Sequence, residues 1–279
     1  MDGGDLYQKF HCLRSLLEKM GSVLVAYSGG VDSTFLLKVA HEVLREKAVA
    51  VTACSETYPA RELEEAMTMA REIGVRHLTI ISEELDIPGF SQNPPDRCYF
   101  CKTELFSKLQ KLAKEEGLQW IVDGTNLDDM GDHRPGRKAA QEMGIRSPLL
   151  ESGLRKEEIR ALSRELGLPT WEKPSMACLS SRFPYGTPIT RERLRMVNAA
   201  EEYLHGLGFR QVRVRHHGEI ARIEVEKGEI PHLLENAGVV AQHLKKVGYT
   251  YVTIDLEGYR SGSLNEVLKK APGEEPGKG

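Results

Sequence analysis

The chain has 279 residues, about the length of two domains, and its 40% hydrophobic and 28% charged residues exclude a disordered, collagen-like or coiled-coil protein. The net charge is −3, with 24 basic and 28 acidic residues over 1–182 and 14 and 13 over 183–279. Neither half has the basic excess of a chain that grips nucleic acid, which disfavours such partners but leaves room for a local basic patch. Apolar runs are far shorter than the ~20 residues of a membrane span, and the polar N-terminus shows no secretory signal. We therefore expect a cytoplasmic protein with no membrane or nucleic-acid partner.

Short apolar runs alternate with amphipathic stretches over residues 1–170. This alternation predicts an α/β domain in which helices cover both faces of a parallel sheet. The predicted strands are Ser22–Tyr27, Ala48–Ala53, His77–Ile81 and Trp120–Asp123, and the predicted helices are Ser33–Glu46, Ala60–Ile73, Phe100–Glu116 and Lys156–Leu166.

The remainder of the chain reads as a linker, a smaller domain and a tail. Residues 171–190 contain Pro174, Pro184, Gly186 and Pro188, and so many helix- and strand-breaking residues disfavour regular structure. The order helix–strand–strand–helix–strand over 191–270 predicts a small α+β domain, and the tail 271–279 is predicted to be disordered. The elements expected in that domain are Arg191–Leu207, Gln211–Arg215, Ile220–Glu226, Ile230–Val247 and Tyr249–Leu256.

A glycine-rich loop, Ser28-Gly-Gly-Val-Asp-Ser33, joins the first predicted strand to the first predicted helix. Its glycines allow close backbone approach, and the helix start supplies unpaired N–H groups, so the loop favours a phosphate. A capped strand–helix turn without a ligand is the alternative. No Lys-Ser or Lys-Thr follows, so this is not a Walker A loop.

The loop resembles the PP-loop of the N-type ATP pyrophosphatases, and Asp123-Gly-Thr-Asn126 resembles the second nucleotide-facing turn of that superfamily. The resemblance implies ATP cleavage between the α and β phosphates, which adenylylates a substrate oxygen and releases pyrophosphate. Mg²⁺ would neutralise the phosphates, with Asp32 a candidate ligand. The residues expected to bind ATP are Ser28, Gly29, Gly30, Asp32, Ser33 and Gly124.

Three of the five cysteines stand out, namely Cys98 and Cys101 in a CxxC pair ahead of a helix, and Cys178 in the linker. A CxxC can be half of a zinc site, a redox pair, part of an iron–sulfur site, or coincidence. No second CxxC is present, which disfavours four-cysteine zinc. Three cysteines near a nucleotide site would suit a [4Fe-4S] cluster with one open iron. Cys12 and Cys54 are expected to be buried hydrophobes.

Asp129–Ala140, Lys173–Gly186 and Arg213–Glu224, together with the glycine-rich loop, closely resemble the LarE family of ATP-dependent sulfur transferases. The resemblance implies adenylylation of a carboxylate of pyridinium-3,5-biscarboxylic acid mononucleotide and replacement of its oxygen by sulfur, in nickel-pincer cofactor synthesis. It also implies a homo-oligomer and, for the cluster type, a sulfide source.

Two forms of this chemistry are known in the family. In one, the cysteine matching Cys178 gives up its own sulfur; in the other, three cysteines bind a [4Fe-4S] cluster that passes on a sulfide. The CxxC favours the second form, with Cys98, Cys101 and Cys178 as ligands and with Cys178 and Asp32 as catalytic residues. The residues expected to bind the substrate are Ser180, Arg182, Arg213, Arg215 and Arg134.

Strand alternation places Arg213 and Arg215 on one face, where paired guanidinium groups hold a phosphate or carboxylates. A solvated sheet face is the alternative for this pair. The rival functions are a tRNA thiolase, which should carry a basic RNA-binding surface, and an ammonia-using ligase such as NAD synthetase, which would leave the cysteines unexplained. A nucleotide-sensing module would also leave the cysteines idle.

Overall fold

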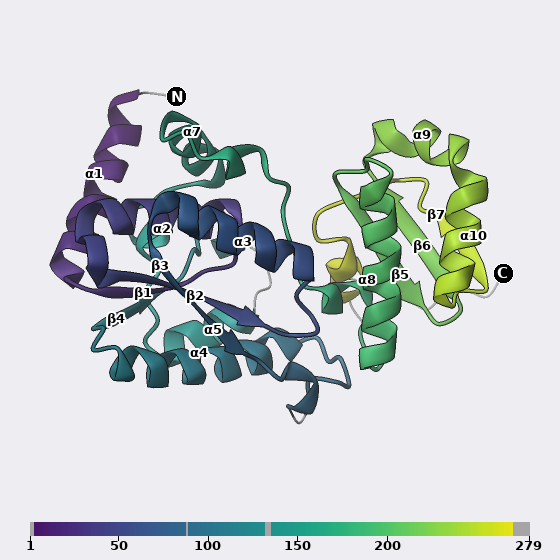
Figure 1. Ribbon diagram of the computed structural model, residues 1–279, viewed down its shortest axis with the longest axis horizontal. Coiled ribbons are helices and arrows are strands. Elements are labelled where there is room, and N and C mark those ends of the chain that lie inside the picture. Colours follow the sequence, from purple (N-terminus) through teal and green to yellow (C-terminus); the bar gives the residue numbers. More distant parts are fainter. Residues whose placement is uncertain (1–2, 88, 132–134, 270–279) are drawn as a thin grey trace. The chain divides into compact units, whose positions relative to one another are not determined.

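The computed structural model describes residues 3–87, 89–131 and 135–269, and the chain divides into two compact units, Met1–Met176 and Ala177–Gly279. The boundary lies inside the segment predicted as a linker. Each unit has its own sheet and its own apolar core (Figure 1). None of the helices in the described ranges is both long enough and apolar enough to cross a membrane.

The first unit contains a four-stranded parallel sheet in the order β3-β2-β1-β4. Because β1 and β4 are neighbouring parallel strands, the segments that follow them emerge side by side at the carboxyl ends of the strands. Both central strands are apolar and buried, as expected for strands covered on two faces. The strands are β1 (Val23–Ala26), β2 (Ala48–Cys54), β3 (Arg76–Ile81) and β4 (Trp120–Val122).

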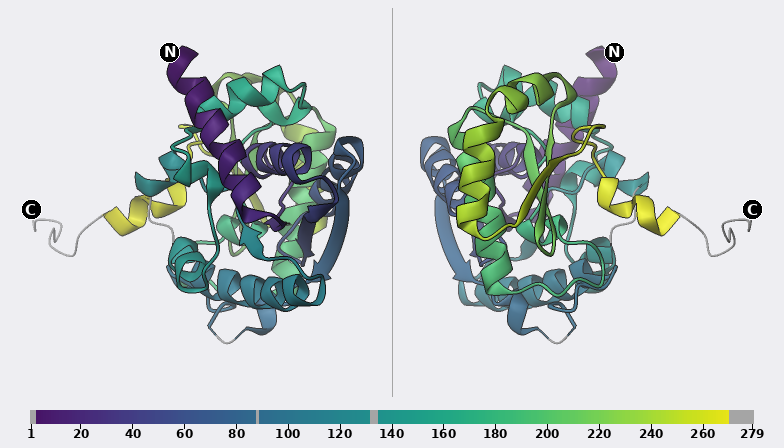
Figure 2. Two further views of the ribbon diagram at one scale, coloured as in Figure 1. Left: turned by 90° about the vertical axis from the view of Figure 1, so that its left-hand side faces the viewer. Right: turned by 90° about the vertical axis from the view of Figure 1, so that its right-hand side faces the viewer.

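Helices cover both faces of this sheet, which confirms the predicted α/β fold class (Figure 1; Figure 2, left). One face packs on α1 (Gly3–Met20), α2 (Val31–Leu44), α3 (Ala60–Ile73) and α7 (Lys156–Glu165). The other packs on α4 (Arg97–Glu115) and α5 (Pro135–Glu142). Short helical segments fill the connections: η1 (Arg45–Lys47), η2 (Glu84–Asp86), η3 (Leu127–Gly131), α6 (Pro148–Glu151) and η4 (Pro169–Glu172).

The second unit is a three-stranded mixed sheet in the order β5-β6-β7, in which β5 and β6 are antiparallel and β6 and β7 are parallel. Helices α8 and α10 cover one face of it (Figure 2, right). Their apolar residues form the core of this unit with the strands. The elements are η5 (Leu179–Arg182), α8 (Arg191–Gly206), β5 (Val212–His217), β6 (Ile220–Val225), η6 (Lys227–Glu229), α9 (Ile230–Glu235), α10 (Ala237–Val247), β7 (Tyr251–Ile254), η7 (Ser263–Asn265) and α11 (Glu266–Lys269).

Three local predictions need correction. The single helix expected over Ile230–Val247 is two helices, because Asn236 ends α9 and caps α10 with a non-helical backbone. The CxxC pair does not precede a helix but lies in the first turn of α4. Cys12 and Cys54, expected to be buried, are exposed and half-buried respectively.

The segment predicted as a linker contains two short helical turns. One of them, η4, packs on α7 in the first unit, and the other, η5, packs on α8 and β5 in the second. The predicted substrate residue Arg134 and the predicted tail 271–279 lie outside the described residues.

Candidate functional site

The glycine-rich loop lies at the carboxyl end of β1, where Gly30 is the N-cap of α2. The loop is held by its own hydroxyl groups: the Ser28 amide donates to Ser33 Oγ at 3.3 Å, and the two serine hydroxyls lie 3.1 Å apart. Ser33 is buried and Ser28 is exposed. The first-turn amides of α2, together with its positive dipole end, give this loop the donors and the field that suit an anion.

Two glycines allow neighbouring elements to approach this loop. Gly29 has a φ of +63°, and a Cβ there would lie 2.8 Å from Cβ of Ala66 in α3. A Cβ on Gly124, which follows β4, would lie 3.0 Å from the Ser33 amide nitrogen. The Asp123–Asn126 turn therefore packs directly on the start of α2, so the structure brings together the two predicted nucleotide-facing turns.

Asp32, in the first turn of α2, has two carboxylate oxygens in different environments. Its Oδ2 accepts a hydrogen bond from Lys156 Nζ at 2.5 Å, whereas its Oδ1 is buried and has no hydrogen-bond partner within the described part of the chain. Burial raises the pKa of Asp32, and the neighbouring Lys156 opposes that shift. An unpartnered buried carboxylate oxygen beside an anion site suits Mg²⁺, which is usually held by one or two carboxylates and the phosphates of its ligand. This donor therefore fits the predicted ion.

The CxxC pair places two thiols on the first turn of α4. Cys98 is exposed and Cys101 is half-buried, and their i,i+3 spacing puts both on one face of the helix. Cys101 Sγ donates to Glu84 Oε1 at 3.7 Å, and burial raises the pKa of Glu84. Two adjacent thiols suit two irons of one cluster. Among the described residues, however, no three His, Cys, Asp or Glu side chains are already gathered around one point.

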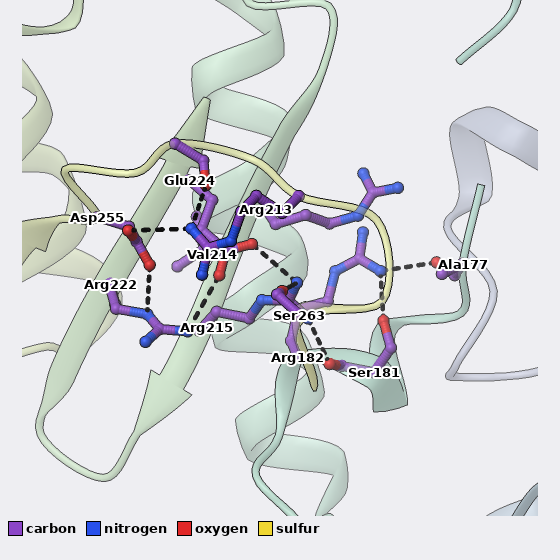
Figure 3. A network of polar contacts seen from close by, with 12 residues as sticks. Ala177, Ser181, Arg182, Arg213, Val214, Arg215, Arg222, Glu224, Asp255 and Ser263 are labelled. Atoms are coloured by element: carbon purple, nitrogen blue, oxygen red, sulfur yellow. Dashed lines mark hydrogen bonds and ion pairs between the residues drawn. The ribbon is translucent and has the colours of Figure 1, made fainter. Parts of the chain in front are cut away.

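In the second unit, Cys178 is the exposed N-cap residue of η5. Arg182 binds the turn that contains it: Nη1 donates to the Ala177 carbonyl oxygen at 2.7 Å (Figure 3). The same nitrogen donates to the Cys178 carbonyl oxygen at 3.1 Å. The remaining donors of Arg182, Nε and Nη2, form a forked pair with Glu201 at 2.8 and 2.7 Å. The donors of Arg182, a predicted substrate residue, therefore form hydrogen bonds within the protein and tie the Cys178 turn to α8.

Arg213 and Arg215 lie on one face of β5 and are buried, so the alternative of a solvated face is wrong. Arg215 donates to the Ser181 carbonyl oxygen at 2.7 Å and to Glu224 Oε2 at 2.8 Å (Figure 3). The guanidinium of Arg213 lies 5.3 Å from the ring centroid of Tyr259. Burial, assisted by the charge of Arg182, lowers the pKa of Arg213 to about 10, which leaves it protonated at neutral pH.

The arginine cluster consists of Arg182, Arg213 and Arg215 with the adjacent Ser180. In it, Nε of Arg215 and the hydroxyl of Ser180 have no hydrogen-bond partner within the described residues. Both belong to buried residues predicted to bind substrate. The cluster therefore combines fixed positive charge with an unused donor and an unused hydroxyl, which suits an anionic ligand.

Sequence reasoning missed the partners of these groups. Lys156 is 124 positions from Asp32, and Glu201 on α8 has the local pattern of an ordinary helix-surface charge. Strand alternation correctly placed Glu224 and Arg222 on one face of β6. It did not indicate that Glu224 is completely buried. No local signal identifies which distant residue neutralises which charge.

The sheet order, the glycine-rich loop and the adjacent second turn define the first unit as a PP-loop domain of the N-type ATP pyrophosphatase class. In agreement, residues 7–92 match the model of a family described as NAD synthase. This match covers less than a third of the chain and concerns the domain type.

Relatives that match nearly the whole chain define the family. An uncharacterized protein of Synechocystis sp. is 48% identical over 95% of this chain and 100% of its own length. The pyridinium-3,5-bisthiocarboxylic acid mononucleotide synthase of Lactiplantibacillus plantarum is 42% identical over 93% of this chain and 94% of its own length. A glutamine-hydrolysing GMP synthase of Aeropyrum pernix is 26% identical over 71% of this chain but only 42% of its own length. The chain belongs to the family of the L. plantarum synthase, the LarE family.

Proposed function

We propose that this enzyme is an ATP-dependent sulfur transferase that acts on pyridinium-3,5-biscarboxylic acid mononucleotide and converts carboxylates to thiocarboxylates for a nickel-pincer cofactor. The observation that carries the proposal is 42% identity over 93% of the chain to a synthase named for the bisthiocarboxylic product. The PP-loop supports an activation step that uses ATP, because its first-turn amides suit phosphate oxygens.

The reaction has two balanced steps. A carboxylate oxygen of the substrate attacks the α-phosphorus of ATP, and the bond to the bridging oxygen breaks with release of pyrophosphate. A sulfur nucleophile then attacks the carbonyl carbon of the acyl-adenylate and AMP leaves. Adenylylation is needed because a carboxylate oxygen is a poor leaving group whereas AMP is a good one.

In the first unit, the loop residues and Asp32 serve the first step. The amides of Gly29 and Gly30, with the hydroxyls of Ser28 and Ser33, would hold the departing pyrophosphate, and Gly124 leaves room at the same edge. Asp32 Oδ1 would hold Mg²⁺, which neutralises phosphate charge, while Lys156 fixes the orientation of the carboxylate through Oδ2.

In the second unit, the arginine cluster would take the phosphate or carboxylates of the substrate. Nε of Arg215 and the hydroxyl of Ser180 have no hydrogen-bond partner in the described part of the chain, and Ser180 adjoins the Ser181 carbonyl group that Arg215 binds. Arg213 contributes a second buried cation, and Arg182 positions the Cys178 turn. We assign Arg134 to the same anionic ligand on the family resemblance alone.

We further propose a cluster-bound sulfide as the source of the sulfur. A [4Fe-4S] cluster bound by Cys98, Cys101 and Cys178 would supply a sulfide that an external source renews. The supporting observation is that the CxxC thiols lie on one face of the first turn of α4. A homo-oligomer working in the cytoplasm is proposed on the resemblance.

Two measurements test these proposals. Pyrophosphate release should require the pyridinium dicarboxylate, and mass spectrometry should show oxygen replaced by sulfur in the product. Release that is independent of this substrate would refute the assignment. Protein purified without oxygen should contain about four irons per chain; Cys98→Ser should lose this iron, whereas Cys12→Ser should keep it. Iron-free protein in which Cys178 becomes dehydroalanine after turnover would establish the sacrificial route instead.

A further inference from the structure

Two side chains from outside the PP-loop hold its carbonyl groups. Tyr58 Oη donates to the Ser28 carbonyl oxygen at 2.7 Å, and Lys173 Nζ donates to the Gly29 carbonyl oxygen at 3.3 Å. In a trans peptide the C=O and the following N–H point in opposite directions. These two bonds therefore turn the amides of Gly29 and Gly30 away from Tyr58 and Lys173.

Lys173 is held firmly at its charged end. Its Nζ lies 2.7 Å from Glu62 Oε2 and 2.9 Å from Glu65 Oε2, both on α3, and only 14% of its side chain is exposed. Although burial raises the pKa of Glu65, the hydrogen bonds from Lys173 and Arg61 outweigh it and hold that pKa below its usual range. The ammonium is therefore fixed between α3 and the loop carbonyl.

The backbone of Lys173 is tied to a second element. Arg160 of α7 donates through Nη2 to the Lys173 carbonyl oxygen at 2.8 Å and through Nη1 to the Trp171 carbonyl oxygen. Lys173 stands five positions before Cys178. One residue thus contacts the PP-loop with its side chain and begins, with its backbone, the segment 173–178 that ends at the candidate sulfur-carrying cysteine.

We propose that Lys173 is a positioning residue that couples the nucleotide state of the PP-loop to the order of the 173–178 segment, an inference that rests on the proposed use of ATP. A phosphate bound to the Gly29 and Gly30 amides favours the same peptide orientation as the Lys173 bond on the opposite side. Each interaction strengthens the other, and this coupling is reciprocal by thermodynamic linkage. The sulfur-carrying segment is consequently most ordered when ATP is in place.

Hydrogen exchange of the full chain, followed by mass spectrometry with and without the uncleavable analogue α,β-methylene-ATP and Mg²⁺, tests the coupling. In the wild type, saturating analogue should slow exchange in the peptide covering Ser175–Cys178 about fivefold or more. Lys173→Met should bind the analogue about fivefold more weakly and, once saturated, show no slowing in that peptide. Tyr58→Phe removes the bonds to the Ser28 and Glu62 carbonyl oxygens but none of the Lys173 contacts, so it should weaken binding yet keep the slowing at saturation.

Lys9→Met is the matched control, because Lys9 also bridges two carboxylates, Asp5 at 3.1 Å and Glu158 at 2.7 Å, but contacts no loop carbonyl. It should behave as the wild type. If Lys173→Met does not fold, Lys173→Gln should show the same loss, since its amide ends one bond short of Nζ. Slowing that persists in a saturated Lys173 variant, or is absent from the saturated wild type, overturns the coupling. A wild type that does not bind the analogue instead contradicts the proposed function.

Discussion

The two units hold their charged groups in opposite ways. In the first unit, the side chain of Asp32 is 21% exposed and one of its oxygens has no hydrogen-bond partner among the described residues. In the second unit, Arg182 and Glu201 are 3% and 6% exposed, and both oxygens of Glu201 and of Glu224 accept hydrogen bonds. The first arrangement leaves an acceptor for a ligand, whereas the second neutralises its carboxylates in advance.

This difference separates residues that act on a ligand from residues that arrange the site. A carboxylate saturated by buried arginines cannot take a cation without losing those partners, so Glu201 and Glu224 fix the arginine geometry. Burial of Asp32 Oδ1 without a hydrogen-bond partner among the described residues lowers the stability of the fold, and a bound cation would offset that loss. Removing a charge should therefore damage folding in the second unit and chemistry in the first.

The largest effect is expected for Glu201→Leu. It leaves Arg182 buried without its counter-ion, and losing one partner of a buried pair costs about 3–5 kcal/mol. Hydrogen exchange of the β5 and β6 amides in increasing urea should report this loss of stability. The double variant Arg182→Met/Glu201→Leu should recover most of it, because no uncompensated charge remains. A single variant as stable as the wild type would mean that the pair does not organise the unit.

Asp32→Asn tests the first unit, where removing a charge should impair the reaction rather than the stability. The substitution keeps the shape of the side chain but removes the charge on Oδ1, so pyrophosphate release should fall ~100-fold, a loss typical of removing one group that stabilises transition-state charge. The unfolding midpoint should change little. Asp5→Asn, at a carboxylate that is 64% exposed, is the control and should release pyrophosphate normally. Unchanged release by Asp32→Asn would remove this residue from the chemistry.

Gly29→Ala should have an intermediate effect. A left-handed backbone costs an L-residue about 1–2 kcal/mol, and the added methyl would also meet Ala66 at 2.8 Å. We expect about tenfold weaker binding of α,β-methylene-ATP by calorimetry. Ala66→Gly in the same chain should restore the part due to the contact but not the part due to φ. Full restoration would show that backbone conformation contributes nothing there.

The smallest effect concerns pH and the second unit. Burial, with the charges of Arg193 and His217, lowers the pKa of His216 to about 4, so the folded state binds fewer protons than the unfolded state between about pH 4 and 6.5. Stability should therefore fall as the pH drops from 6.5 towards 4. His216→Gln should make this dependence shallower in urea titrations at several pH values. An identical slope in the variant would assign the dependence to other groups.

Much of the fold followed from local pattern. Ala60–Ile73 was predicted with the bounds that α3 has, and the parallel sheet was inferred from alternation, because apolar spacing reports which face of an element is buried. The PP-loop was found because glycines, hydroxyls and a helix start are contiguous in sequence. The break at Asn236 was missed because Asn236 and the nearby Gly238 are poor helix formers, but neither residue type by itself ends a helix.

The sequence by itself determined the elements, the loop and the chemistry of the candidate residues, since each depends on neighbours a few positions away. Only the tertiary structure decided that Lys156 binds Asp32, that Lys173 binds Gly29 and that Arg213 and Arg215 are covered. These contacts join residues as many as 144 positions apart, and many lysines and glutamates compete for each partner. Local periodicity is the same whichever partner is chosen, so the pairing is fixed by how the elements pack.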